Sequence, residues 1–277
     1  MSVLELFPSP ARRSDGLFAQ IVERLAVRIL TRQYQAGDLL PSQDELGRDL
    51  PASRTAYREA VKYLTSKGLI EARPKSGTRV APRANWNLID PEVLRWSLNG
   101  KPSDKLVCDL FEIRRIIEPN AARLAAERRT AEQLDTLRRA IDGMMSLPVY
   151  TEANYRADIA FHDAIVDGAN NAALACLKGL VRTTILWSVR LNTGLRSPKD
   201  FAKPLADHRR VFEAIEQRDG ERASAFMTVL VVDAVEEALR NIAHLRASEA
   251  KADGGERRVN AHVVPLGVKR SKGGKPA

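Results

Sequence analysis

Hydrophobic positions recur at helical spacing along most of the chain. In residues 17–33, the apolar positions Leu17, Ile21, Leu25 and Ile29 follow one another at four-residue steps, which predicts an amphipathic helix. Similar patterns predict helices at residues 106–128, 131–147, 151–167, 171–192, 197–218 and 220–246. No alternating strand pattern occurs in this second half. The sequence therefore predicts a mainly α protein whose C-terminal domain is an all-α helical bundle.

The pattern between residues 40 and 81 is different, because two short helices are followed by two short apolar runs. Residues 43–50 predict the first helix, Ser53 is a natural N-cap for the second, and Lys67-Gly68 ends it. Two strands are expected at residues 69–72 and 78–81. This order of elements is typical of a winged helix-turn-helix domain.

Polar and basic side chains gather at the start of the second of these helices, where Arg54, Thr55, Tyr57 and Arg58 are expected to point outward. Arginine recognises guanine in the major groove, small hydroxyl groups bind phosphates, and a basic wing tip suits the minor groove. The alternative is a helical hairpin with a solvated basic face. The helix cap, the residue spacing and the basic wing tip together favour DNA binding. The predicted DNA contacts are Ser42, Ser53, Arg54, Thr55, Arg58, Lys75, Gly77 and Arg79.

The same stretch, residues 16–81, resembles the winged-helix domain of the GntR family of bacterial transcription regulators. The matching motifs are Ser53-Arg54-Thr55, Arg58-Glu59-Ala60, Lys67-Gly68-Leu69-Ile70 and Gly77-Thr78-Arg79-Val80. Two departures are Gln43, where the family usually has glutamate, and Pro51-Ala52 before the Ser-Arg pair. The resemblance implies a transcription factor that binds double-stranded DNA. A homodimer on a palindromic operator is expected, because a two-fold protein recognises a two-fold site.

Charge and composition fit this interpretation. The net charge is +9 and the pI is near 9.8, which suits a polyanionic partner, although residues 251–275 supply part of the excess. The sequence shows neither a signal peptide nor an apolar run long enough to span a membrane, so a cytoplasmic protein is expected. Cys108 and Cys176 lie in apolar helical patterns and are expected to be buried free thiols.

The chain divides into five predicted segments. They are a flexible arm at 1–15, a DNA-binding head at 16–81, a linker at 82–102, an effector-binding and dimerisation domain at 103–247, and a disordered basic tail at 248–277. In the linker, Asp90-Pro91-Glu92 predicts the start of a short helix. Trp86 and Trp96 are expected to dock the linker between the domains and to transmit the effector signal; stacking on DNA bases is the alternative. In the motif Pro82-Arg83-x-x-Trp86-Asn87-x-x-Asp90-x-x-Val93-Leu94-x-Trp96, the linker resembles that of the galactonate-operon repressor group in the FadR-type branch.

Polar residues occupy positions on apolar helical stripes in the C-terminal half. Asp158 and His162 lie one turn apart, His208 lies among apolar residues, and Arg114 and Glu118 lie one turn apart on an earlier helix. Burial of such groups is costly unless they are paired, bind a metal or line a polar cavity. Spacing alone leaves open that they are ordinary core histidines and ion pairs.

Residues 106–246 resemble the FCD effector domain of FadR-type regulators. The resemblance rests on Glu112-x-Arg114-x-x-x-Glu118, Asp158-x-x-x-His162 and His208. In many such domains an aspartate and three histidines hold a divalent metal such as Zn²⁺. Asp158, His162 and His208 match three of these ligands, whereas the fourth position is Leu230, with Asp233 one turn on as a substitute. Arg114 matches the arginine that faces an acidic effector.

The predicted function is a repressor of a sugar-acid catabolism operon, of the aldonate or galactonate type. A small carboxylate effector would bind Arg114, Asp158, His162 and His208 and release the protein from its operator. The chain is not expected to be an enzyme, since no further candidate base lies at motif spacing. A metal-dependent enzyme fused to a DNA-binding head and an architectural DNA binder are the alternatives, and the second leaves the buried polar residues unexplained.

Overall fold

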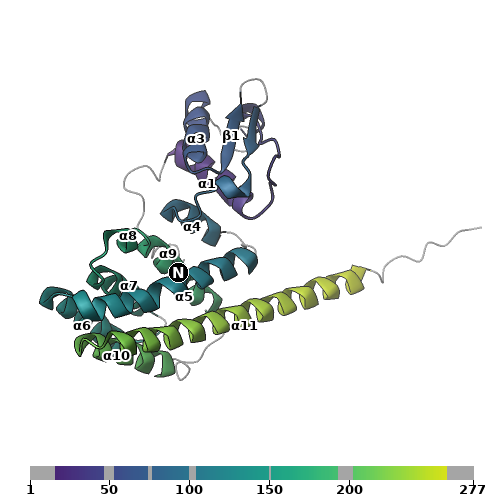
Figure 1. Cartoon of the computed structure of the whole chain (residues 1–277). Coiled ribbons are helices and arrows are strands. Elements are labelled where there is room, and N and C mark those ends of the chain that lie inside the picture. Colours follow the sequence, from purple (N-terminus) through teal and green to yellow (C-terminus); the bar gives the residue numbers. More distant parts are fainter. Residues whose placement is uncertain are drawn as a thin grey trace, which may run out of the picture.

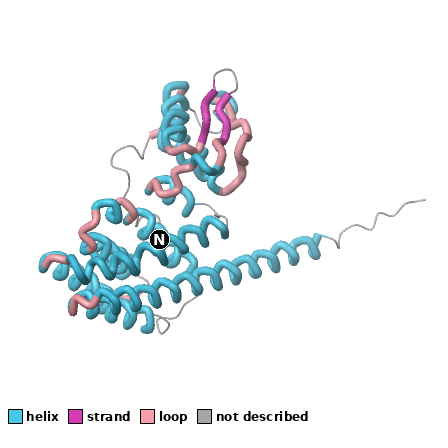
Figure 2. Tube along the Cα trace, in the orientation of Figure 1, coloured by secondary structure: helices cyan, strands magenta, loops and turns pink. Residues whose placement is uncertain are grey.

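The computed structural model describes residues 16–46, 53–73, 77–99, 104–149, 151–192 and 202–260, with two helical units joined through a short helix (Figure 1). Secondary structure is almost entirely helical, apart from one two-stranded sheet in the N-terminal unit (Figure 2). This confirms the predicted fold class of an N-terminal winged helix-turn-helix domain followed by an all-helical domain.

The N-terminal unit has its core between helices α1 and α3. Its elements are α1 (Leu17–Leu30), α2 (Gln43–Leu46), α3 (Arg54–Ser66), β1 (Ile70–Arg73) and β2 (Gly77–Val80). Ile21, Leu25 and Ile29 of α1 are fully buried with Ala60 and Leu64 of α3, as the four-residue spacing predicts. The strands pair antiparallel, with Ile70 opposite Val80. Residues 47–52, which include the end of the first predicted helix and the turn after it, lie outside the described residues.

Gly68 follows the C-cap of α3 and has a backbone conformation that residues with a side chain rarely adopt. Its φ is +73°, and a Cβ at this position would lie 1.9 Å from the carbonyl oxygen of Asn85 in the linker. Glycine is therefore needed both for the left-handed turn and for the close approach of the linker.

We expect Gly68→Ala to lower stability by more than the roughly 1–3 kcal/mol of a strained backbone alone, because the linker must also move. Gly37→Ala is the matched control, since Gly37 has φ +91° but nothing within 4 Å of its added Cβ. Thermal unfolding of both variants measures the difference. Equal losses of stability would show that the linker contact contributes nothing.

The linker packs on both domains through helix α4 (Pro91–Asn99), which follows a 3₁₀ turn at Arg83–Asn85. Val93 and Trp96 belong to the core of the N-terminal unit, whereas Leu94 belongs to a cluster with Leu106 and Leu180 of the C-terminal domain. An ion-pair group also ties α3 to the linker. In that group Lys67 Nζ lies 2.7 Å from Asp90 Oδ2 and 3.0 Å from Glu92 Oε2.

Trp96 is a core residue of the DNA-binding head as well as a linker residue. It is 1% exposed and lies edge-on to Tyr63, with ring centroids 6.5 Å apart. We therefore expect Trp96→Ala to cost about 3–5 kcal/mol of unfolding free energy, because it leaves a large cavity. Trp86→Ala should cost less, since Trp86 is only half-buried. Denaturant unfolding monitored by circular dichroism checks the order, and a larger loss at Trp86 would contradict it.

The C-terminal domain is a bundle in which α5 packs along α11 and α7 packs along α6 (Figure 1). Its helices are α5 (Asp104–Arg128), α6 (Ala131–Ser146), α7 (Glu152–Gly168), α8 (Ala172–Ala175), α9 (Lys178–Asn192), α10 (Ala202–Glu216) and α11 (Gly220–Asn260). The single helix predicted at 171–192 is instead two, because the backbone turns at Leu177, whose carbonyl accepts from Leu180 and Val181 as α9 begins. No proline marks this break in the sequence.

Two further predictions are corrected. Helix α11 extends to Asn260, so the disordered tail expected from residue 248 is wrong for residues 248–260; the helix continues through Gly254 and Gly255 because extending an existing helix is easier than starting one. The rest of the tail, residues 261–277, and the arm at 1–15 lie outside the described residues. Cys108 of α5 and Cys176, directly after α8, are free but exposed, because both positions face solvent rather than the core of the bundle. Among the helices that the structure describes, none is long and apolar enough to cross a membrane.

Candidate effector and DNA-binding sites

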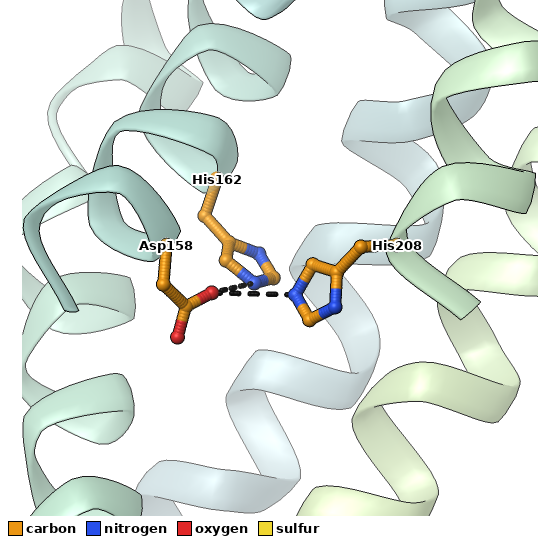
Figure 3. Close-up of side chains that lie close together, drawn as sticks. All are labelled: Asp158, His162 and His208. Carbon is orange, nitrogen blue, oxygen red and sulfur yellow. Dashed lines mark ion pairs between the residues drawn. The ribbon is translucent and has the colours of Figure 1, made fainter. Parts of the chain in front are cut away.

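Three polar side chains from two helices meet inside the C-terminal domain. Asp158 and His162 of α7 and His208 of α10 point toward one another (Figure 3). Asp158 Oδ1 lies 3.4 Å from His162 Nε2 and 3.2 Å from His208 Nε2. One candidate ligand atom from each residue lies within 4.8 Å of the others. The helices that carry these residues therefore converge, which spacing alone did not show.

Both imidazole rings have further contacts besides those with Asp158. Phe161 lies edge-on to both rings, with centroid distances of 5.6 Å to His162 and 5.2 Å to His208. The Nδ1 atom of His208 lies 2.6 Å from the carbonyl oxygen of Pro204, one turn earlier on α10. Both histidines are buried, at 2% and 6% exposure. The contact with Pro204 directs the Nε2 atom of His208 toward Asp158.

Helix α5 adds a buried ion-pair network to this cluster. Glu118 pairs through Oε1 with Arg114 Nε and through Oε2 with His162 Nδ1. Arg114 Nη2 also lies 3.5 Å from His162 Nε2. The simple Arg114–Glu118 pair considered from the sequence is present, but it is joined to the histidine cluster. Glu118 was not among the predicted site residues, although its place on an apolar stripe was the signal that could have identified it.

The network shifts the pKa values of its side chains. Burial raises the pKa of Glu118, but the charges of Arg114 and His162 outweigh this effect and lower it to about 2. Burial lowers the pKa of His162, whereas Glu118 and Asp158 outweigh it and raise it to about 9. The Asp158 side chain is 18% exposed; desolvation raises its pKa, but its contacts with His162 and His208 outweigh this effect and hold the pKa well below the usual range. Both carboxylates are therefore ionised at neutral pH.

Neither the position of the family's fourth ligand nor its candidate substitute belongs to this cluster. Leu230 is 5% exposed within the main apolar core of the domain. Asp233 pairs with Lys203 at the surface and is not part of the cluster. Asp233 is therefore not a substitute for the fourth ligand. Within the described ranges, the group that could hold a metal consists of Asp158, His162 and His208.

The residues that are present suit a divalent metal. Asp158 Oδ1 and His208 Nε2 are buried and form no hydrogen bond with any described residue, although they face each other. Two imidazole nitrogens and one carboxylate oxygen are a donor set that binds Zn²⁺ and similar ions, and three protein ligands leave positions open for other molecules. The chemistry of the donors therefore fits the metal that the family resemblance implies.

In the N-terminal unit, the start of α3 presents the predicted recognition residues. Ser53 caps the helix by accepting from the Ala56 backbone N–H at 3.1 Å, and Arg54, Thr55 and Arg58 are exposed. Tyr57 was expected to point outward, but it is half-buried and donates to the Pro41 carbonyl at 2.8 Å. Tyr57 therefore holds α3 against the segment before α2, because its ring lies on the inner side of the helix.

The remaining predicted DNA contacts have structural partners or lie outside the described residues. Ser42 caps α2 and exchanges hydrogen bonds with Glu45, including one of 2.7 Å from its backbone N–H. Arg79 donates to the Gly37 carbonyl at 2.9 Å, which ties the wing to the segment after α1. Gly77 has φ +75° at the start of β2, where glycine is favoured. Lys75 lies outside the described residues.

Comparison with known proteins agrees with this arrangement. The model of the bacterial regulatory proteins of the gntR family matches residues 17–80, and that of the FCD domain matches residues 109–234. The galactonate operon transcriptional repressor of Escherichia coli (strain K12) is 32% identical over 204 residues, covering 74% of this chain and 89% of the relative. YieP, an HTH-type transcriptional regulator of the same strain, is 35% identical over 212 residues, covering 73% and 87%.

The fold is shared with a solved structure as well. Lar of Listeria monocytogenes, described as controlling the expression of the agr system, aligns with a TM-score of 0.58 at 16% identity, covering 83% of this chain and 99% of that chain. The family models, the identity to the relatives and the positions of the two domains agree with one another. The chain therefore belongs to the gntR family of bacterial regulatory proteins, with an N-terminal helix-turn-helix domain and a C-terminal FCD domain.

Proposed function

We propose that this transcription regulator represses a sugar-acid catabolism operon and leaves its operator when a small carboxylate binds the C-terminal domain. The observation that carries the proposal is the convergence of Arg114, Asp158, His162 and His208 inside the domain, where Asp158 Oδ1 and His208 Nε2 are buried without a hydrogen bond to any described residue. Similarity to the galactonate operon repressor supports an aldonate as the effector class.

Each side chain has a role in this proposal. Arg114 binds the effector carboxylate with charge-assisted hydrogen bonds. Asp158, His162 and His208 would hold a divalent metal such as Zn²⁺, which would supply a positive charge for the carboxylate and hydroxyl oxygens of the effector. Effector binding then shifts the population away from the arrangement that fits DNA. The enzyme and architectural alternatives are not favoured by the comparisons, since the relatives are named as transcriptional regulators and a repressor.

Ser42, Ser53, Arg54, Thr55, Arg58, Lys75, Gly77 and Arg79 remain the proposed DNA contacts. Two copies would place their α3 helices on the two halves of a palindromic operator. The hydrogen bond of Arg79 with Gly37 supports a role for this residue in holding the wing, in addition to contact with DNA.

A thermal-shift screen tests the effector proposal. The protein, with and without Zn²⁺, is mixed with galactonate, gluconate, related aldonates and aldarates, and neutral galactose as the control. We expect a carboxylate to raise the unfolding temperature by mass action, and the shift to be larger with Zn²⁺. A response to galactose equal to that to galactonate, or no response to any acid, would contradict the proposal.

A further inference from the structure

We infer that Glu118 is a positioning residue of the effector site: its carboxylate holds the Nδ1 atom of His162, so that the Nε2 atom of the same ring faces the site as an electron-pair donor. The inference rests on the proposed function, since it concerns how one of the proposed ligands is oriented. It assigns a role to a buried side chain on α5 that neither the metal nor the effector needs to touch.

The position of Glu118 determines which ring nitrogen of neutral His162 carries the hydrogen. Glu118 is 1% exposed, and its Oε2 atom forms the ion pair with His162 Nδ1. An ionised carboxylate only accepts hydrogen bonds, so Nδ1 must carry the hydrogen. In the neutral ring, Nε2 then carries an electron pair, which accepts from Arg114 Nη2 at 3.5 Å. This electron pair faces Asp158 Oδ1 at 3.4 Å.

His208 also directs an unprotonated Nε2 atom toward Asp158, but a different contact holds its ring. Its Nδ1 atom donates to the Pro204 carbonyl at 2.6 Å, which leaves Nε2 as the acceptor beside Asp158 Oδ1 at 3.2 Å. With both rings neutral, two nitrogen electron pairs and one carboxylate oxygen would face one another. Such a group is electrostatically unfavourable alone and favourable around a cation. The orientation of His208 comes from its own helix, whereas that of His162 depends on a different helix.

Glu118 also joins the two parts of the proposed site. Its other oxygen, Oε1, pairs with Arg114 Nε, so the same carboxylate positions the proposed effector clamp and the proposed ligand ring. Arg114 in turn is 3% exposed and has its charge balanced by Glu118. Substitution at position 118 should therefore change metal affinity without removing any ligand atom.

Glu118→Gln tests the inference, because glutamine offers one accepting oxygen in place of two. The charged Nε–H of Arg114 should take that oxygen, so that the amide NH₂ faces His162 Nδ1. That atom must then accept, and the ring hydrogen moves to Nε2, where it points into the site. We expect the affinity for Zn²⁺ alone to fall roughly 10- to 100-fold. Glu112→Gln, an exposed glutamate on the same helix, is the matched control and should bind Zn²⁺ like the wild type.

Nitrogen NMR of histidine-labelled protein gives the direct readout, and the chain has only 4 histidines to assign. Spectra of metal-free protein at a pH above the raised pKa of His162, about 9, should show His162 protonated on Nδ1 in the wild type and on Nε2 in Glu118→Gln. His208 should keep its form in both. Calorimetric titration measures the affinity of each variant for Zn²⁺, and circular dichroism checks that each variant is folded.

An Nε2-protonated His162 in the wild type would overturn the inference, and that measurement needs no variant to fold. An unchanged His162 form and unchanged Zn²⁺ affinity in a folded Glu118→Gln protein would overturn it as well. If the wild type binds no Zn²⁺ but the ring hydrogen still moves in the variant, the role of Glu118 stands and the metal part of the proposed function fails.

Discussion

Replacing both Arg54 and Arg58 with alanine is expected to weaken specific operator binding strongly. Both side chains are exposed at the start of α3, on the side away from the core formed with α1. An arginine that recognises a base contributes roughly 1–3 kcal/mol, so the double substitution should weaken binding by roughly 30-fold to 10⁴-fold. Since neither arginine contributes to the core, the fold should remain intact.

Fluorescence anisotropy with operator DNA and a scrambled duplex, at several salt concentrations, measures this effect. In the single variants, removal of an arginine that binds a base should reduce the preference for operator. Removal of an arginine that binds a phosphate should weaken binding to both duplexes and lower the salt dependence. Lys62→Ala is the control, because Lys62 is exposed further along the same helix and pairs with Glu59. Wild-type binding by the double variant would show that α3 is not the recognition helix.

Replacing Arg114 or His162 is expected to leave operator binding intact and to remove the response to the effector. Arg114→Ala removes the proposed carboxylate clamp, and His162→Ala removes a proposed ligand and the partner of Glu118. Charge-assisted hydrogen bonds contribute about 1.5–3 kcal/mol each, so loss of a two-bond clamp should weaken effector binding by roughly 100-fold or more. A ligand that no longer binds one state better cannot shift the population.

Arg114→Ala leaves Glu118 without its main partner, which could unfold the protein. Arg114→Lys is therefore measured as a second variant. Lysine keeps the charge near Glu118 but lacks the planar fork, so the fold should survive while the effector response is still weakened. Arg115→Ala, an exposed neighbour, is the matched control. Operator release against effector concentration and calorimetric effector binding are the measurements. Normal effector binding by both the Arg114 and the His162 variants would mean that the group is only a buried ion-pair network.

The local elements follow closely from the sequence because their causes are local. The four-residue spacing in α1, the Ser53 cap of α3 and the glycine that ends α3 each act within one or two turns. The predicted helical bundle is present for the same reason. The break between α8 and α9 and the extension of α11 to Asn260 were missed. Neither has a strong local signal, since proline is absent from the break and Gly254 and Gly255 lie within the extension.

The domain relationships depended on tertiary contacts. Trp96 was recognised as a docking residue from its place in the linker, but only packing shows that its ring lies in the core of the head. Leu94, two positions earlier, packs into the other domain instead. A helix of nine residues can serve both domains because neighbouring positions lie on different faces.

By itself, the sequence determined which polar groups occupy apolar stripes, because helical spacing assigns each residue to a face of its own helix. It placed Asp158 beside His162 and Arg114 beside Glu118. Only the tertiary structure decided that α5, α7 and α10 bring these pairs and His208 together, and that Glu118 faces His162 rather than Arg114 alone. Contacts between helices depend on how the bundle packs, and side chains 44 or more residues apart have no spacing rule that predicts their meeting.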